Sequence, residues 1–303
     1  MLQKTAKVAF IIQCHKNPEQ IHLLTDGLKK IFDCRIFLHV DKKSAQIRPV
    51  LDTDRHTLVP EEKSIDVRWG KFSQCEATLE LIEAVFSSEE KFDYICLISG
   101  QDLPIVSRED AARLLPESPV PFIQVIGPDD PMHRYYAKRN DVFCPDWMIQ
   151  RTLFFRILRR LYLIMTGGRG YTFPIFRRKW DIPYYFGSSW WCLPYNCVGE
   201  MMKILKSNQE YIDYFKHAVN PDESLFQTLF MQTSYAGQQK NILTYVDWSQ
   251  GKSSPRTFTA DQWEALVAAK KNHAFARKFD YSLDKAVCHR VMTELCGLSP
   301  EEE

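Results

Sequence analysis

Two adjacent carboxylates, Asp222 and Glu223, stand at the start of a stretch whose pattern predicts a helix. Pro221 suits the first helical turn, because proline has no N–H to lose there. Apolar residues then recur at three- and four-residue spacing through Phe230, which predicts a face buried in a core. A carboxylate fixed at such a point can accept a proton, and Glu223 is the candidate general base. The alternative that both carboxylates only cap the helix stays open here.

The composition is that of a globular chain with a sizeable core. Its 303 residues are 45% hydrophobic, a length and content that suit one large α/β domain. Lys and Arg number 39 against 38 Asp and Glu. The net charge of +1 therefore gives no field that would favour nucleic acid as a partner.

The nine cysteines lie mostly in apolar runs, without the spacing of a disulfide framework. Cys192 and Cys197 have no second pair or nearby histidine, so no zinc site is expected. Reduced thiols predict a cytoplasmic location. The N-terminal stretch MLQKTAKVAFIIQCHK has a short apolar run and no cleavage site, which predicts a strand and not a signal peptide or membrane anchor.

Three apolar runs, at residues 7–14, 35–40 and 94–99, predict strands of a mostly parallel sheet. Residues 18–32 have a helical rhythm, so the chain begins as a β-α-β unit. Residues 119–126 predict a further short strand.

Polar residues follow these strands directly. His15 follows the first strand and Asp41 the second, at the carboxyl ends where open α/β sheets bind ligands. Gln101 and Asp102 follow the third strand, in a loop that ends in proline. No glycine-rich dinucleotide or phosphate-loop motif is present, which excludes the commonest nucleotide sites. A lone aspartate after a strand also forms turns, so a purely turn-forming role stays open for Asp41 and Asp102.

A basic stretch runs from Arg151 to Lys179, with eight basic residues and no acidic one. Its helical part, residues 153–165, interleaves arginines with large apolar side chains. One interpretation is a surface for an anionic or membrane-attached acceptor. The other is a core helix whose arginines extend to the surface.

Residues 184–193 are dense in aromatic side chains around Gly187 and Ser188. Flat aromatic faces beside small polar residues suit the stacking of a sugar ring, with Trp190 as the candidate. Taken alone, a tryptophan pair such as Trp190 and Trp191 is usually part of a core.

Six short motifs, taken together, resemble one enzyme family. In chain order they are HVDKKS (39–44), SGQDLPI (99–105), FGSSWWCL (186–193), NPDESLFQTL (220–229), SPRTF (254–258) and FARKFD (275–280). Their order and spacing are similar to those of the core-2/I-branching β-1,6-N-acetylglucosaminyltransferases and the related peptide O-xylosyltransferases. The resemblance spans residues 7–282 and implies a GT-A-type glycosyltransferase fold, a Rossmann-like, mostly parallel sheet flanked by helices.

The resemblance also implies a UDP-sugar donor, inversion at the anomeric carbon, and no divalent metal or other cofactor. The family's catalytic base falls on Glu223, and its two diphosphate-binding cations fall on Arg256 and Lys278. Its nucleotide-binding residues fall on Ile12, Gln13, His15 and Asp41. Its positions near the donor and acceptor sugars fall on Gln101, Asp102, Gly187, Ser188, Trp190 and Asp222.

We expect one domain over residues 1–303, with a nucleotide-binding half at 7–110, an acceptor and catalytic half at 111–282, and a C-terminal helix and tail at 283–303. Animal members of the family have a membrane anchor and disulfides, which this sequence lacks. The expected protein is therefore a cytoplasmic, bacterial relative, peripheral at the inner face of the membrane, with a saccharide or glycolipid acceptor.

Three alternatives stay open at this point. The donor could be UDP-xylose, because donor choice depends on the size of the pocket around the sugar. A non-catalytic carbohydrate-binding protein could share the fold, but the presence of Glu223, Arg256 and Lys278 together disfavours it. A metal-dependent nucleotidyltransferase would need paired acidic ligands, and neither strand-end motif is an Asp-x-Asp.

Overall fold

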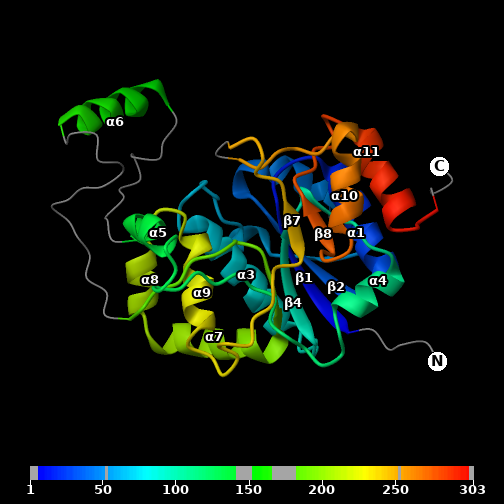
Figure 1. Ribbon diagram of the computed structural model, residues 1–303, viewed down its shortest axis with the longest axis horizontal. Coiled ribbons are helices and arrows are strands. Elements are labelled where there is room, and N and C mark those ends of the chain that lie inside the picture. The colour runs from blue at the N-terminus through cyan, green and yellow to red at the C-terminus, as the bar shows by residue number, and fades with distance from the viewer. Residues whose placement is uncertain (1–5, 52–53, 141–151, 166–181, 252–253, 300–303) are drawn as a thin grey trace.

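The centre of the fold is a five-stranded sheet with strand order β3-β2-β1-β4-β6. β1 (Lys7–Cys14) pairs in parallel with β2 (Asp33–Val40) and with β4 (Tyr94–Ser99). β3 (Thr57–Leu58) extends the parallel part, and β6 (Trp191–Pro194) is antiparallel at the other edge. The computed structural model describes residues 6–51, 54–140, 152–165, 182–251 and 254–299 (Figure 1).

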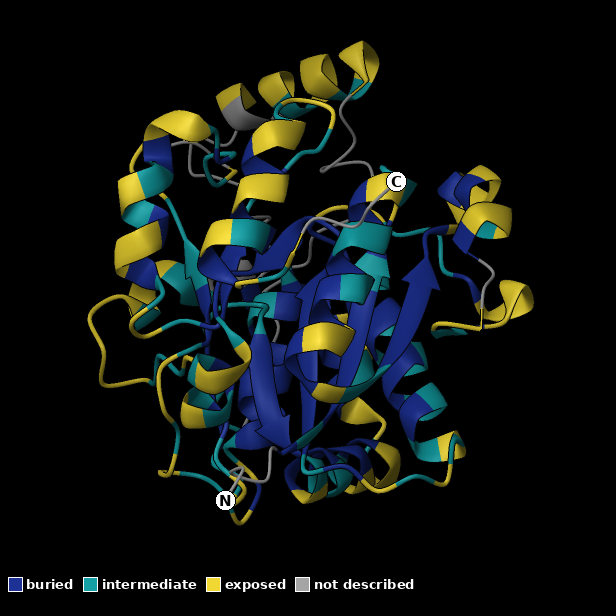
Figure 2. Cartoon of the chain, turned by 90° about the vertical axis from the view of Figure 1, so that its right-hand side faces the viewer, coloured by how far each residue is buried: buried dark blue, intermediate teal, exposed yellow. Residues whose placement is uncertain are grey.

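Successive residues of β1 face two different hydrophobic cores. Phe10 and Ile12 belong to one cluster of buried side chains, and Ala9 and Ile11 belong to the other. Both faces of the strand are covered, which is why the sequence of β1 is continuously apolar. Figure 2 shows the buried strands between helices whose outer faces are exposed.

Helices cover both faces of the sheet. α1 (Pro18–Ile31), α10 (Trp263–Ala269) and α11 (Lys285–Arg290) contribute to the first core. α3 (Ser73–Ser87) and α7 (Tyr195–Ser207) contribute to the second core (Figure 1). This arrangement confirms the predicted mixed α/β fold with a mostly parallel sheet flanked by helices.

Shorter helical segments complete the connections. They are η1 (Lys42–Ile47), α2 (Arg48–Leu51), η2 (Glu61–Lys63), α4 (Arg108–Leu114), α5 (His133–Asn140), α8 (Glu210–Phe215) and the π-helical turn η6 (Val291–Leu295). A further helix, α6 (Leu153–Met165), lies apart from the body of the molecule (Figure 1).

A second, three-stranded sheet brings the C-terminal motif to the end of β4. Its order is β5-β8-β7, formed by β5 (Asp102–Pro104), β8 (Phe275–Arg277) and β7 (Thr244–Val246). β5 follows β4 almost immediately and pairs antiparallel with β8, with Asp102 opposite Arg277. The FARKFD motif therefore lies beside the loop that follows the parallel strand.

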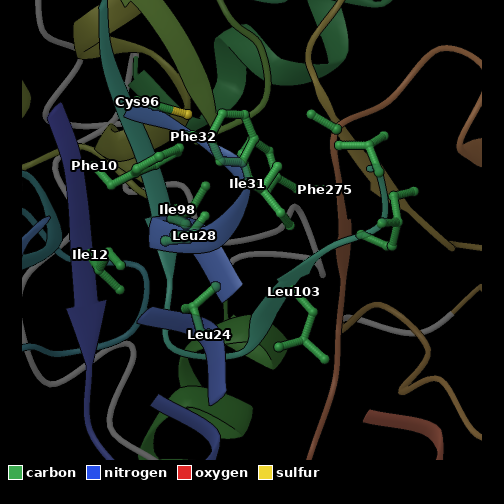
Figure 3. Packing of buried hydrophobic residues seen from close by; sticks show 14 of the residues in the cluster. Phe10, Ile12, Leu24, Leu28, Ile31, Phe32, Cys96, Ile98, Leu103 and Phe275 are labelled. Atoms are coloured by element: carbon green, nitrogen blue, oxygen red, sulfur yellow. The ribbon is translucent and has the colours of Figure 1, made fainter. Parts of the chain in front are cut away.

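Three phenylalanines fix β8 against the large sheet. The Phe10 ring centroid lies 5.1 Å from that of Phe32 and 5.7 Å from that of Phe275. Phe32 and Phe275 stack at 5.8 Å, and Figure 3 shows all three in the first core. Aromatic contacts of this kind add stabilisation beyond simple burial.

The strand predicted at residues 119–126 is wrong. Only Phe122 and Ile126 form isolated bridges there. Pro119 and Pro121 have no N–H to donate, so a regular ladder cannot form across this segment. A capping box formed by Thr259 and Gln262 starts η5 (Ala260–Gln262).

The eight cysteines among the described residues are all free, and only Cys34 is not fully buried. Burial raises the pKa of the Cys14 thiol to about 12, as expected for an inert core residue. Cys144 lies outside the described residues. In the part of the chain that the structure describes, no helix combines the length and apolar character needed to cross a bilayer.

Candidate active site

The two adjacent carboxylates lie on two short helices and not on the single helix predicted. η4 (Pro221–Glu223) ends at Ser224, whose φ of −143° breaks the helix, and α9 (Leu225–Phe230) follows. Asn220 starts the turn in the left-handed region with φ 52°, which asparagine tolerates. The N-cap residues Asn220 and Ser224 make no side-chain capping hydrogen bond, and both carboxylates lie in the first turn of η4. Asp222 is buried, whereas Glu223 is only partly buried.

Asp222 connects the η4 turn to the end of the parallel sheet. Its Oδ2 accepts a hydrogen bond from Ser189 Oγ at 2.7 Å and a longer one from Gln74 Nε2 at 3.5 Å. The main-chain oxygen of Gln74 in turn accepts from Gln13 Nε2 at 3.0 Å. The carboxylate pair is thereby linked to β1, although more than two hundred residues separate them in sequence.

Buried polar side chains at the start of α9 fix the aromatic segment. Ser224 Oγ donates to the Tyr185 carbonyl at 2.9 Å, and the Tyr185 N–H donates to Thr228 Oγ1 at 3.0 Å. Gln227 Nε2 donates to the Ser188 carbonyl at 2.7 Å. These three polar side chains are fully buried. Apolar periodicity alone does not identify these three residues as part of the site. Polar residues within such an apolar helix are nevertheless a signal of buried hydrogen bonds.

Gly187 lets this segment approach the candidate base closely. Its N–H donates to the carbonyl oxygen of Glu223 at 2.9 Å. A Cβ at this position would lie 2.0 Å from the carbonyl oxygen of Gln124, so no larger residue fits without a backbone shift. The predicted site residues Gly187 and Glu223 are therefore in direct main-chain contact.

Arg277, which is not among the site residues predicted from the sequence, joins the aromatic segment to the sheet. Its Nη1 lies 2.6 Å from Asp102 Oδ1 and also contacts Ser99 Oγ. The guanidinium carbon lies 4.2 Å from the ring centroid of Trp190, a cation–π distance. Burial raises the pKa of Asp102, while Arg277 and the hydrogen bonds from Ser99 act in the opposite direction.

Three of the predicted sugar-contact residues are buried beneath the site. Asp102 is completely buried, and Gln101 and Asp222 are 6% and 8% exposed. The Gln101 carbonyl accepts from the Phe279 N–H at 2.8 Å. The side chains of Asp102 and Asp222 hold neighbouring groups in place through Ser99, Arg277 and Ser189. Gly187, Ser188 and Trp190 are the predicted sugar-contact residues that are not fully buried.

The two predicted phosphate-binding cations come from adjacent segments. The Phe258 N–H donates to the Lys278 carbonyl at 2.8 Å, so the SPRTF and FARKFD motifs run side by side. Arg256 lies two residues before Phe258, and Lys278 directly follows Arg277. The backbone segments that carry Arg256 and Lys278 are therefore adjacent, and Lys278 directly follows the arginine that contacts Trp190.

The electrostatic environment at this edge is positive. Partial burial lowers the pKa of Lys278, and Arg277 and Lys16 lower it further. Desolvation and the charges of Lys16, Lys278 and Arg277 likewise lower the pKa of His15, against the opposite effect of Asp41. Asp280 offsets part of this charge, because its Oδ2 pairs with Lys16 Nζ at 2.6 Å. Concentrated positive charge of this kind favours a phosphate group.

The predicted nucleotide-binding residues line the ends of β1 and β2. Gln13 is partly exposed and donates to Thr78 Oγ1 at 2.7 Å. Asp41 accepts from the Lys43 N–H at 3.0 Å and so caps η1, as a turn-forming aspartate does. Ile12 is completely buried in the first core, so its side chain supports the site only from beneath.

Across the described part of the chain, no three His, Cys, Asp or Glu side chains are grouped to hold a metal ion. An open cleft of about 480 Å³ lies elsewhere, between α4, α10 and η6. None of the residues that line this cleft belongs to the candidate site.

Comparison with known proteins gives a family match and distant structural similarities. The sequence model of the core-2/I-branching enzyme family matches residues 8–270. The solved apo structure of WbbM, a bifunctional glycosyltransferase, is similar with 10% identity and a TM-score of 0.35. The alignment covers 90% of this chain and 45% of that one, so this chain spans less than half the length of WbbM. No curated protein sequence matches the chain.

Substituting Gly187→Ala should destabilise the protein by about 1–3 kcal/mol, because the new Cβ would collide with the Gln124 carbonyl. Gly199→Ala is the matched control. Gly199 lies in α7, and a Cβ added there would meet nothing within 4 Å, so alanine should be neutral or stabilise by up to about 1 kcal/mol. Chemical denaturation of both variants measures the difference. Equal stability of the two would contradict the close approach at Gly187.

Proposed function

Because the chain belongs to the core-2/I-branching enzyme family, and is therefore a glycosyltransferase, we propose that it transfers a sugar from a UDP-sugar with inversion and without a divalent metal. The acceptor is a saccharide or glycolipid, and the product has a β-linkage. One observation carries the proposal: a continuous set of contacts links Glu223 through residues 187–190 to Arg277 and Lys278. These contacts support a single site bordered by a carboxylate and by cations able to bind phosphate.

Glu223 is the proposed general base. In a single displacement with inversion, a base removes the proton of the acceptor hydroxyl while its oxygen attacks the anomeric carbon. Asp222 is engaged with Ser189, and Glu223 is the partly exposed member of the pair. Its main chain is held by Gly187, so the carboxylate starts from a fixed backbone position. A nearby negative charge also stabilises a transition state with oxocarbenium character.

Arg256 and Lys278 are the proposed partners of the UDP diphosphate. The leaving UDP gains negative charge as its bond to the sugar breaks, and preorganised cations stabilise that charge. Arginine can bind two phosphate oxygens at once, and lysine supplies a compact point charge. The neighbouring cations Lys16 and Arg277 are each paired with an aspartate. Burial lowers the pKa of Lys278 most, the charges of Arg277 and Lys16 lower it further, and Asp280 acts in the opposite direction.

N-acetylglucosamine is the donor sugar we propose, with xylose as the alternative within the same chemistry. The two sugars differ in their substituents at C2 and C5. Measuring hydrolysis of UDP-N-acetylglucosamine and UDP-xylose side by side distinguishes them, because water can replace the acceptor in such enzymes. A protein that binds UDP but hydrolyses and transfers neither sugar would favour a non-catalytic carbohydrate-binding role.

The Glu223→Gln variant should turn over at least about a hundredfold more slowly while its UDP affinity stays unchanged, because a general base contributes at least that factor. Glu62→Gln, which alters an exposed carboxylate on η2, is the control and should behave as wild type. Steady-state kinetics and UDP calorimetry on both variants provide the test. Unchanged turnover in Glu223→Gln would remove Glu223 from the mechanism.

UDP affinity should fall as the pH rises through the lowered pKa of Lys278, because the lysine is charged below that pKa and neutral above it. In Lys278→Arg the charge persists, so its affinity should fall less steeply over the same alkaline range. The uracil ring of UDP titrates equally with the wild type and with Lys278→Arg. The difference between the two pH profiles therefore reports on residue 278. Profiles of identical shape would show that Lys278 does not bind the diphosphate.

A further inference from the structure

α6 carries a row of large apolar side chains that face solvent. Figure 1 shows this helix set apart from the two layers around the sheet. The exposed fractions of its apolar side chains run from 37% to 83%. The residues are Leu153, Phe154, Ile157, Leu158, Leu161, Ile164 and Met165. The interpretation of residues 153–165 as a core helix is therefore wrong.

The exposed apolar side chains and the arginines of α6 lie on different sides of the helix, whereas the sequence positions of Phe155 and Leu163 fall outside the apolar arc. At 100° per residue, the seven apolar side chains fall within an arc of about 140°. The three arginines, Arg156, Arg159 and Arg160, fall within an arc of about 100° on the other side. The helix contains no acidic residue. An exposed apolar face of this extent marks an interaction surface.

We propose that α6 binds the surface of an anionic lipid bilayer, with its axis in the plane of the membrane. Its apolar side would enter the boundary between headgroups and acyl chains, and its arginines would contact anionic headgroups. Charge selects this occupant. A helix with three arginines and no carboxylate is complementary to an anionic surface, whereas two copies of the same helix would repel each other.

The segments on either side of α6 in the chain are attached to the candidate site. Before it, Asn140 Nδ2 at the end of α5 donates to Ser224 Oγ at 2.8 Å. His133 of α5 also donates to the carbonyl of Tyr184 at 2.9 Å, and Tyr184 lies three residues before Gly187. A bilayer bound by α6 is thus tethered to the region of Glu223. If the proposed function holds, this connection favours a lipid-linked saccharide as the acceptor. The rest of the basic stretch, Arg151 and residues 166–181, lies outside the described residues.

Vesicle co-sedimentation of the full chain tests the proposal. Wild-type protein should sediment with vesicles of phosphatidylcholine and phosphatidylglycerol, and should stay in solution with phosphatidylcholine alone. Replacing Arg156, Arg159 and Arg160 by glutamine should weaken binding to the anionic vesicles on the order of a hundredfold. Ile157→Ser with Leu161→Ser should also abolish sedimentation, because the apolar side then cannot insert.

Two matched variants control for charge and apolar content elsewhere on the surface. Lys203, Lys271 and Lys285 are exposed, and replacing all three by glutamine removes the same charge. Val267→Ser with Leu283→Ser removes two other exposed apolar side chains. Both controls should bind anionic vesicles as wild type does, and every variant should keep wild-type UDP affinity as evidence of folding.

Two results would overturn the membrane proposal. One is that the wild-type protein does not bind anionic vesicles. The other is that the α6 variants and their controls lose binding equally. A wild-type dimer in light scattering that dissociates in Ile157→Ser with Leu161→Ser, without vesicle binding, would instead assign the face to a second copy of the chain. Vesicle binding needs no catalysis, so its outcome is separable from a failure of the proposed transferase activity.

Discussion

The ion pair between Arg277 and the completely buried Asp102 is the interaction on which the rest of the candidate site depends. A buried carboxylate is costly unless it is paired and hydrogen-bonded, and Asp102 is satisfied by Arg277 and Ser99. The pair fixes Arg277 against the end of β4, and Lys278 follows directly in the chain. Stacking of Trp190 on the same guanidinium then brings in the segment that contacts Glu223.

A second constraint acts from the opposite side of the site. The buried side chains of Ser224, Gln227 and Thr228 use their hydrogen bonds to hold residues 185–188 and not to cap a helix. The aromatic segment is therefore held at both ends, by α9 and by Arg277. An active site benefits from such support, because small displacements of catalytic groups reduce rates strongly.

The sequence was sufficient to predict the parallel strands β1, β2 and β4, but not the edge strands of the sheet or the connections among the motifs. The strands at residues 7–14 and 94–99 have the predicted bounds, because each is an apolar run bounded by polar residues. The break at Ser224 and the role of Arg277 depend on partners distant in the chain, which local periodicity cannot reveal. The exposure of α6 was equally hidden, because an amphipathic pattern is the same whether its apolar side meets a core or a membrane.

In the proposed mechanism, Arg256 and Lys278 do for UDP what a divalent ion does in other enzymes. Calorimetry of UDP binding in excess chelator tests this role most directly, on wild type, Arg256→Ala, Lys278→Ala and the surface control Lys285→Ala. We predict metal-free binding that each site variant weakens about tenfold or more, with the control unchanged. The proposed role of the two cations would be contradicted if the wild type did not bind UDP without metal. It would also be contradicted if both site variants bound UDP with wild-type affinity.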